Sequence, residues 1–473
     1  MSQFTELREL IEVREAKVCI MGQGYVGLSL AMGAIDAGFF TYGFDVDDQR
    51  VRALASGRSH VLDVPRSRLQ SALSTGRYHP CSDPRVIHDS QVVVICVPTP
   101  LRKSKDPDVS FIIEAASQTI THLSRPTLVI LESTSYPGTT EELLAAEIRR
   151  QGYRVGEDVF VCFSPERVDP GNKVFRVGNT PKVIGGITRE CTALGALFYS
   201  SIVQQVIPVS SARVAEMVKL LENTFRAVNI GLVNELALLC ERMGIDIWEA
   251  IDAAATKPFG YVPFYPGPGL GGHCIPLDPL YLSWKARSYD FYNKLIELAS
   301  DINGNMPRHV VVRIAEALNL EGKAIKDSRI LILGMAYKKD TDDIRESPSL
   351  EVFRLLRLQG AAVNFHDPHV KDFSDGKERI TSVRLTATSI AQYDCVALLT
   401  NHTAFDYPWI ARNSRLIVDT RNAFGEIKAP HIIRIGAPIA TPDEWSRIRS
   451  ATKEAAVSGQ QSLSSAGAGE RLP

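Results

Sequence analysis

Short apolar runs alternate with longer amphipathic stretches over the first two hundred residues. In chain order, the runs are KVCIMG (17–22), FFTYGFDVD (39–47), VVVICVP (92–98) and TLVILEST (127–134). Stretches such as 111–123 and 141–151 between and after them have the periodicity of helices. A regular alternation of this kind is what a doubly wound sheet requires. Residues 1–211 are therefore predicted to form one α/β domain.

One long helix follows this domain. Residues 212–244 contain no proline and one internal glycine, and a helix of that length is expected to bridge domains. The helical pattern continues to about residue 320. Apolar side chains on more than one face of 212–244 predict a homodimer built around it. Residues 212–320 are thus predicted to be a central helical dimerisation region.

A second α/β pattern begins after the helical region. Its apolar runs are RILILGMAY (329–337), AAVNFHDP (361–368), YDCVALLT (393–400) and RLIVDTR (415–421). We predict a second Rossmann-like domain over 321–450 and a disordered tail over 451–473, where serine, alanine, glycine and glutamine dominate. The predicted fold class is α/β, with two Rossmann-like doubly wound domains joined by a long central helix.

Composition narrows the kind of partner. The 473 residues include 53 basic and 54 acidic ones, and no block of like charge suggests a nucleic-acid or membrane surface. The eight cysteines are scattered without a C-x-x-C pair, which argues against a zinc site and a disulfide framework. No secretory h-region and no run of about 18 apolar residues is present. We expect a cytoplasmic protein that binds a small molecule and no metal.

The first strand runs into a dinucleotide-binding pattern. Gly22, Gly24 and Gly27 form G-x-G-x-x-G, and Asp45 closes the second strand 45 − 27 = 18 residues later. The glycines allow a tight turn beside a pyrophosphate, and an acid at Asp45 would bind the ribose and repel a 2′-phosphate. NAD is therefore favoured over NADP. Arg50 either closes over the adenosine or is merely solvated.

A cysteine stands in constrained backbone at PGPGLGGHCIPLDP (266–279). The glycines favour a loop that approaches a ligand, and a helix is expected to start near Asp278, which would stabilise a Cys274 thiolate. A buried inert thiol is the alternative. Together with NAD, a nucleophilic Cys274 indicates oxidation beyond the aldehyde, through a thiohemiacetal and a thioester.

Lys219 and Asn223 share one face of the long helix with Glu216, which suits either a substrate contact or an ordinary polar face.

Six motifs of the chain resemble the family of UDP-glucose and UDP-N-acetylhexosamine 6-dehydrogenases over roughly residues 16–445. They are GQGYVGLSLA, ESTSYPGTT, FSPERVDPG, KLLENTFRAVNIGLVNE, GPGLGGHCIPLDPLYL and GMAYKKDTDDIRESPS. The resemblance implies two oxidations at C6 of a UDP-sugar, with two NAD⁺ and one water.

The resemblance also implies residue roles. Cys274 would be the nucleophile and Asp278 would position a water or the hydroxyl. Lys219 and Asn223 would hold the C6 oxygen, while Thr134 and Glu166 would order and deprotonate the hydrolytic water. The implied cofactor site comprises Gly22, Gly24, Tyr25, Val26, Gly27, Asp45, Arg50, Pro98, Thr99, Ser133 and Arg345. The implied substrate site comprises Arg167, Val168, Tyr265, Gly271 and Lys338.

The cysteine loop is most similar to that of the UDP-N-acetylglucosamine 6-dehydrogenases, with His273 and Pro276 the informative positions. UDP-N-acetylmannosamine and UDP-glucose remain alternative substrates. Two other classes stay open: a two-electron hydroxyacid dehydrogenase, which explains neither Cys274 nor the second α/β domain, and an inactive binding homologue.

Overall fold

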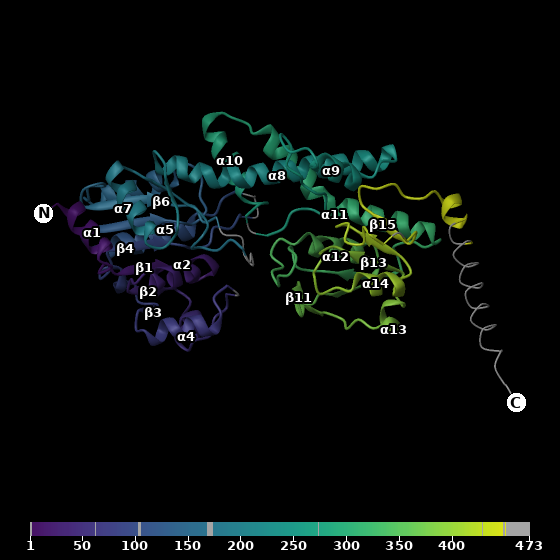
Figure 1. The fold of residues 1–473 in the computed structure, drawn as a ribbon, viewed down its shortest axis with the longest axis horizontal. Coiled ribbons are helices and arrows are strands. Elements are labelled where there is room, and N and C mark those ends of the chain that lie inside the picture. Colours follow the sequence, from purple (N-terminus) through teal and green to yellow (C-terminus); the bar gives the residue numbers. More distant parts are fainter. Residues whose placement is uncertain are drawn as a thin grey trace. The chain divides into compact units, whose positions relative to one another are not determined.

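The computed structural model describes residues 2–61, 63–102, 106–167, 174–272, 274–427, 429–447 and 450. The predictions made for Val168, His273 and the tail 451–473 lie outside these residues. The chain forms two compact units. The first comprises Met1–Phe225 and Leu277–Ile296, and the second Arg226–Pro276 and Glu297–Pro473. Figure 1 labels helices and strands of both units.

The first unit is built on an eight-stranded sheet of order β3-β2-β1-β4-β5-β6-β7-β8. Its strands are β1 Val18–Met21, β2 Thr41–Phe44, β3 Tyr78–Cys81, β4 Val92–Ile95, β5 Thr127–Leu131, β6 Val159–Phe163, β7 Lys182–Gly186 and β8 Val206–Pro208. Neighbouring strands run parallel except for β6 and β7, which pair antiparallel. The predicted doubly wound sheet is confirmed.

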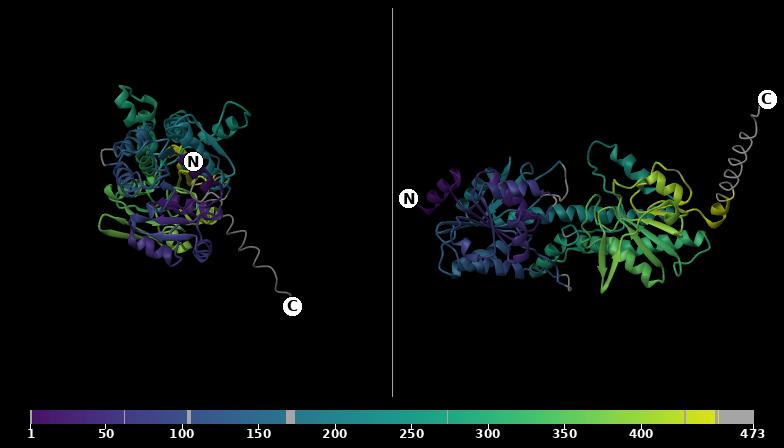
Figure 2. Two further views of the ribbon diagram at one scale, coloured as in Figure 1. Left: turned by 90° about the vertical axis from the view of Figure 1, so that its left-hand side faces the viewer. Right: turned by 90° about the horizontal axis from the view of Figure 1, so that it is seen from below.

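Helices cover both faces of this sheet (Figure 2). They are α1 Gln3–Glu12, α2 Tyr25–Asp36, α3 Asp48–Ala55, α4 Arg66–Ser74, α5 Ser110–Thr121, α6 Ala146–Arg150 and α7 Arg189–Ser200. A further helix of this unit, α10 Asp278–Ala286, instead packs its Tyr281 with Tyr136 and Leu220. The uninterrupted apolar strands follow from this cover, because successive side chains of β1 point to opposite faces. Val18 and Ile20 join one core, and Cys19 and Met21 join the other.

The helix predicted over 141–151 is only partly an α-helix. It begins at Thr140 as a π-helix, Thr140–Ala145, and becomes α-helical only over Ala146–Arg150. Two other short helical turns are 3₁₀, Pro84–Ile87 and Arg287–Tyr289. The π turn follows the segment that carries Thr134, and π turns often occur at functional sites.

The second unit has a parallel five-stranded sheet of order β10-β9-β13-β14-β15. The strands are β9 Arg329–Leu333, β10 Ala362–His366, β13 Cys395–Leu398, β14 Ile417–Asp419 and β15 Ile432–Arg434, and a hairpin joins β11 Asp372–Asp375 to β12 Glu378–Thr381. The helices are α9 Ile247–Ala255, α11 Lys294–Leu320, α12 Pro348–Leu358, α13 Ala387–Ile390 and α14 Tyr407–Asn413. The second predicted Rossmann-like domain is confirmed.

The predicted long helix is α8, Ala212–Met243. The division between the two units falls within it, after Phe225. α8 is therefore the central helix that the sequence predicts. Among the described residues, no helix is both long enough and apolar enough to cross a membrane.

Candidate functional site

The glycine turn after β1 has the geometry of a pyrophosphate cradle. Gly22 has φ +89°, and a Cβ there would lie 2.6 Å from the carbonyl oxygen of Cys96. A Cβ on Gly27 would lie 1.8 Å from the carbonyl oxygen of Gly22, whereas one on Gly24 would meet nothing within 4 Å. α2 starts directly after Gly24, and no side chain of the N-cap residue accepts from its first amides. These residues fit a dinucleotide.

Asp45 and Arg50 lie together beside this turn. The Asp45 carboxylate is buried, accepts a hydrogen bond from the Gln23 amide at 2.7 Å, and lies 2.9 Å from Nη1 of Arg50. Arg50 is thus held by an ion pair with Asp45, while its side chain stays 37% exposed. The acid and the arginine stand together where β2 ends, so a cofactor ribose placed there would meet both.

Two further predicted cofactor segments end at the same edge of the sheet. Ser133, after β5, donates its hydroxyl to the Val97 carbonyl at 2.9 Å. The Thr99 carbonyl, after Pro98, accepts from the Tyr281 hydroxyl at 2.9 Å. These bonds fix the two segments beside the glycine turn, because parallel strands bring their carboxyl ends to one edge.

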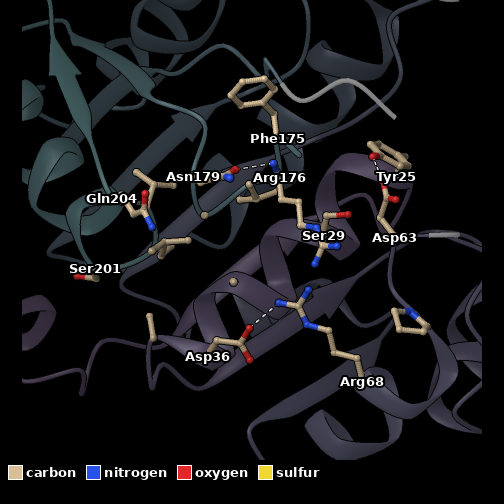
Figure 3. Close-up of a pocket in the computed structure, with 17 residues that line it drawn as sticks. Tyr25, Ser29, Asp36, Asp63, Arg68, Phe175, Arg176, Asn179, Ser201 and Gln204 are labelled. Carbon is tan, nitrogen blue, oxygen red and sulfur yellow. Dashed lines mark hydrogen bonds and ion pairs between the residues drawn. The ribbon is translucent and has the colours of Figure 1, made fainter. Parts of the chain in front are cut away.

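The Tyr25 side chain points elsewhere. It lines a cavity of about 1130 Å³ on the outer side of α2, where its hydroxyl donates to Asp63 and Arg68 pairs with Asp36 (Figure 3). The described residues that line this cavity include none of the predicted catalytic side chains. The Tyr25 side chain therefore faces this cavity, while its backbone is at the first position of α2, next to the glycine turn.

Four predicted catalytic residues meet in two hydrogen-bonded pairs. Nζ of Lys219 donates to the Thr134 hydroxyl at 2.6 Å, and the Asn223 amide donates to Oδ2 of Asp278 at 2.6 Å. α8 supplies the lysine and the asparagine, and Asp278 opens α10. The spacing of one helical turn on α8 thus places Lys219 and Asn223 beside two other predicted catalytic residues.

Asp278 is buried, and this burial decides its protonation. Burial raises the pKa of Asp278 to about 6, and the charge of Lys219 and the bond from Asn223 only partly offset the effect. A carboxyl group with this pKa can exchange a proton near neutral pH, which suits a group that takes or returns the proton of a hydroxyl.

Glu216 holds the segment behind Thr134. Its carboxylate accepts from the Gly138 amide at 2.6 Å and from the Thr140 amide and hydroxyl at 2.8 and 2.7 Å. Burial raises the pKa of Glu216 to about 7, and those hydrogen bonds lower it only in part. Glu216 thus contacts the protein backbone, unlike Lys219 on the same face.

Glu166 lies beside a lysine that the sequence did not single out. Nζ of Lys182 lies 2.9 Å from Glu166 and 2.8 Å from Glu132. Arg167 instead pairs with Glu222 of α8 at 2.6 Å and donates to the Pro181 carbonyl at 2.9 Å. A lysine at the start of a strand carries no sequence signal for such a role.

The cysteine loop belongs to the second unit. A Cβ on Gly271 would lie 2.5 Å from Cβ of Tyr337, and Gly272, with φ +84°, packs its Cα face on the Tyr337 ring. The Gly272 amide donates to the Arg345 carbonyl at 3.0 Å. The loop therefore needs glycine at both positions in order to lie this close to the segment that carries Arg345.

The cation that acts on the Cys274 thiol is the Arg345 side chain. α10 begins at Asp278, so the predicted start of this helix is confirmed, and Cys274 lies in the turn that precedes it. Asp343 chiefly raises the pKa of the Arg345 guanidinium, and Cys274 contributes to the same rise. By reciprocity, Arg345 favours the thiolate of Cys274.

The carboxyl edge of the second sheet carries further polar groups. Tyr265 donates to Asp252 at 3.0 Å and stacks on Trp248. Arg421, at the end of β14, was not predicted: its Nε donates to the Leu399 carbonyl at 2.9 Å, and burial lowers its pKa to about 10. Its Nη1 lies 2.6 Å from the position of a Cβ on Gly267. An arginine directly after a strand was the available signal.

Asp340, His369 and His402 approach one another, each offering a ligand atom within 4.8 Å of the others. Nδ1 of His402 accepts from the Asp340 amide at 2.9 Å, and Nε2 lies 3.1 Å from Asp367. Asp367 also accepts from the Met335 amide at 2.7 Å. The cluster is thus a brace for the turn that carries Lys338, because the lone pair of His402 is already in use.

Comparison with known proteins agrees with these sites. The NAD-binding, central and UDP-binding domain profiles of one family match residues 16–203, 213–305 and 331–426. The chain belongs to the UDP-glucose/GDP-mannose dehydrogenase family. It is an NAD-dependent UDP-sugar dehydrogenase, as the fingerprint and the resemblance predicted.

Individual relatives carry several substrate names. The chain is 34% identical over 424 residues to a UDP-N-acetyl-D-mannosamine dehydrogenase of Pyrococcus horikoshii, covering 88% of this chain and 98% of the relative. It is also 34% identical over 396 residues to a UDP-N-acetyl-D-glucosamine 6-dehydrogenase of Salmonella typhi, covering 83% and 91%. The solved structure of the UDP-D-ManNAc dehydrogenase from Pyrococcus horikoshii matches with a TM-score of 0.81 at 32% identity, over 89% of this chain and 99% of that one.

Proposed function

We propose that the protein oxidises C6 of a UDP-N-acetylhexosamine, with UDP-N-acetylglucosamine the first choice, to the uronic acid in two steps. The observation that carries this proposal is the pairing of Lys219 with Thr134 and of Asn223 with a buried Asp278. A lysine, an amide and a carboxyl group that titrates near pH 6 are what deprotonation and holding of a C6 oxygen require.

The chain's own residues account for the remaining chemistry. NAD supplies the hydride acceptor in both oxidations. Asp278 takes the hydroxyl proton in the first, while Lys219 stabilises the negative oxygen. The Cys274 thiolate then adds to the aldehyde carbon and forms a C–S bond. After the second oxidation the carbon is a thioester; water adds, Glu166 takes its proton, the C–S bond breaks, and the thiolate and the acid separate.

We further propose the division of labour along the chain. Residues 1–211 bind NAD, 212–320 form the central region with the cysteine loop, and 321–450 bind UDP. Lys338, Tyr265, Gly271 and Arg167 are the proposed substrate contacts, and the partly buried Arg421 is added to them for the phosphates. We propose that the Arg345 guanidinium stabilises the thiolate of Cys274.

We also propose a homodimer in the cytoplasm. One stripe of α8 consists of large apolar side chains between 37% and 60% exposed: Val214, Met217, Leu221, Leu232, Leu236, Leu239 and Met243. These positions recur at helical spacing over the whole length of α8, which favours burial against a second copy. All eight cysteines are free thiols, which suits a reducing compartment.

The test of the function counts reduced cofactor for each sugar in a panel of UDP-GlcNAc, UDP-ManNAc, UDP-GalNAc and UDP-glucose. We expect two NADH per sugar, with the fastest turnover on UDP-GlcNAc. One NADH per sugar would indicate a two-electron dehydrogenase, and none an inactive binding homologue. A preference for UDP-ManNAc would overturn the first-choice substrate alone.

Variants of Cys274 test the covalent step. Cys274→Ser should lose nearly all acid formation, because its hydroxyl is a far weaker nucleophile, while UDP-sugar binding persists. Intact mass can reveal a slowly released adduct on the serine variant, whereas Cys274→Ala should bind sugar and trap none. If either variant yields two NADH per sugar at close to the wild-type rate, Cys274 is not the nucleophile.

A further inference from the structure

Lys182 is buried between two carboxylates in the first unit. Its ammonium lies 2.9 Å from Oε2 of Glu166 and 2.8 Å from Oε1 of Glu132. The side chains of Lys182, Glu132 and Glu166 are 5%, 0% and 10% exposed. Water screens such charges weakly, so the charge of Lys182 acts strongly on Glu166.

The antiparallel pairing of β7 with β6 creates this contact. Phe163 of β6 lies opposite Gly185 of β7, and the Ser164 hydroxyl donates to the Val183 carbonyl at 2.8 Å. The chain that leaves β6 therefore runs back along the start of β7, where it brings Glu166 to Lys182. A parallel β7 would begin at the opposite edge of the sheet.

Glu132 fixes the other side of the ammonium. It also accepts a hydrogen bond from the buried Tyr199 hydroxyl, and Nζ of Lys182 lies 5.1 Å from the Tyr199 ring centroid. Burial opposes the charge on Lys182, yet the two carboxylates outweigh burial and raise its pKa. Lys182 therefore remains a cation throughout the working pH range.

We propose that Lys182 is a positioning residue for thioester hydrolysis, which holds the Glu166 carboxylate ionised and oriented toward the attacking water. This inference rests on the proposed role of Glu166 as the base. In the step concerned, Glu166 accepts a proton from water as the water oxygen bonds to the thioester carbon. The C–S bond then breaks and Cys274 leaves as the thiolate.

The alternative is a structural ion pair that only joins β6 to β7. Other titratable groups face this pair: Glu132, Tyr199 of α7, and Cys96, whose sulfur lies 3.8 Å from Glu132. The Arg167 guanidinium is directed to Glu222. A structural role predicts lower stability, whereas the positioning role predicts a displaced pH profile.

The test measures single-turnover hydrolysis of the thioester as a function of pH, with the Cys274 adduct followed by intact mass. The acid limb of the pH–rate profile is the fall in rate as Glu166 becomes protonated. Lys182→Met should displace this limb to higher pH by about one to three pH units, because an adjacent cation lowers a carboxyl pKa by that much. Glu132→Gln should displace it downward, since the charge of Lys182 then acts on Glu166 alone. Lys182→Arg should restore the wild-type limb.

The matched control is Lys285→Met, which breaks another lysine–glutamate pair of the same unit, with Glu142 at 2.8 Å, away from Glu166. Its acid limb should stay in place. If Lys182→Met does not fold, Lys182→Met with Glu132→Gln removes one charge of each sign and must show the upward displacement.

Glu166→Gln distinguishes the positioning role of Lys182 from the proposed role of Glu166 as the base. If that variant accumulates the thioester while Lys182→Met leaves the limb unmoved, the positioning role is overturned and the function stands. If Glu166→Gln hydrolyses the thioester at the wild-type rate, the base assignment fails, and the role of Lys182 fails with it.

Discussion

At the residue scale, environment determines what Asp278 can do. Its carboxyl group has the same intrinsic acidity as any other aspartate, with an ordinary pKa of 3.8, and burial beside Lys219 and Asn223 brings it to about 6. Ionising Asp278 is thus less favourable in the folded protein than in the unfolded chain. Wherever the carboxyl group is ionised, this difference lowers the free energy of unfolding.

This shift predicts how stability depends on pH. The destabilisation is absent below about pH 4, develops as pH rises to about 6, and then amounts to roughly 3 kcal/mol, from (6 − 3.8) × 1.36. Asp278→Asn should therefore raise the melting temperature at pH 8 more than at pH 4 while it abolishes turnover. An equal change at both pH values would contradict a raised pKa.

Asp45 and Arg50 give a second residue-scale prediction. The Arg50 guanidinium is held by Asp45 at 2.9 Å, so Asp45→Ala both removes a repulsive charge and frees an arginine for a 2′-phosphate. The ratio of kcat/KM for NAD⁺ over NADP⁺ should fall at least tenfold.

Asp45→Ala combined with Arg50→Ala is the control, because the freed arginine is then missing. The double variant should gain little activity with NADP⁺. Equal turnover of the wild type with both cofactors would refute the assignment of Asp45.

At the element scale, α8 has two different tasks on its faces. One face carries Glu216, Lys219 and Asn223 in contact with the first unit, and another carries the exposed apolar stripe. A single helix can serve both because side chains three or four positions apart share a face. Proposed catalysis and proposed assembly are thus coupled through one element.

The stripe predicts the effect of a charge on assembly. Leu239→Glu places a carboxylate on a surface that a second copy would bury, and it should convert the dimer to a monomer in light scattering at micromolar concentration. Leu358→Glu, on an exposed leucine of α12, is the matched control and should leave the mass unchanged. A monomeric wild type would refute the dimer.

At the scale of the whole molecule, each sheet presents its polar groups at the carboxyl ends of its strands. The glycine turn, Ser133 and Glu166 follow β1, β5 and β6, and Arg421 follows β14. Parallel strands leave their connections at that edge, where loops can carry ligand-binding groups without disturbing the core. The same architectural rule therefore serves two different ligands.

From the sequence we could predict the long helix, the glycine turn, the cysteine loop and the most apolar strands, but not β3, β6, β7, β8, β11, β12 or β15. These features depend on local constraints: alternation of apolar side chains, the absence of a Cβ, and the spacing of Lys219 and Asn223 within one helix. The six motifs also predicted the family, because they occur in this chain in the same order as in the family.

The tertiary structure alone decided which distant groups meet. Lys182 reaches Glu132 across fifty residues of chain, Glu216 holds a segment that precedes it by more than seventy, and the pKa of Asp278 follows from its burial. The antiparallel pairing of β7 likewise had no local signal. Contacts and desolvation of this kind depend on packing between elements, and a residue's neighbours in sequence do not encode them.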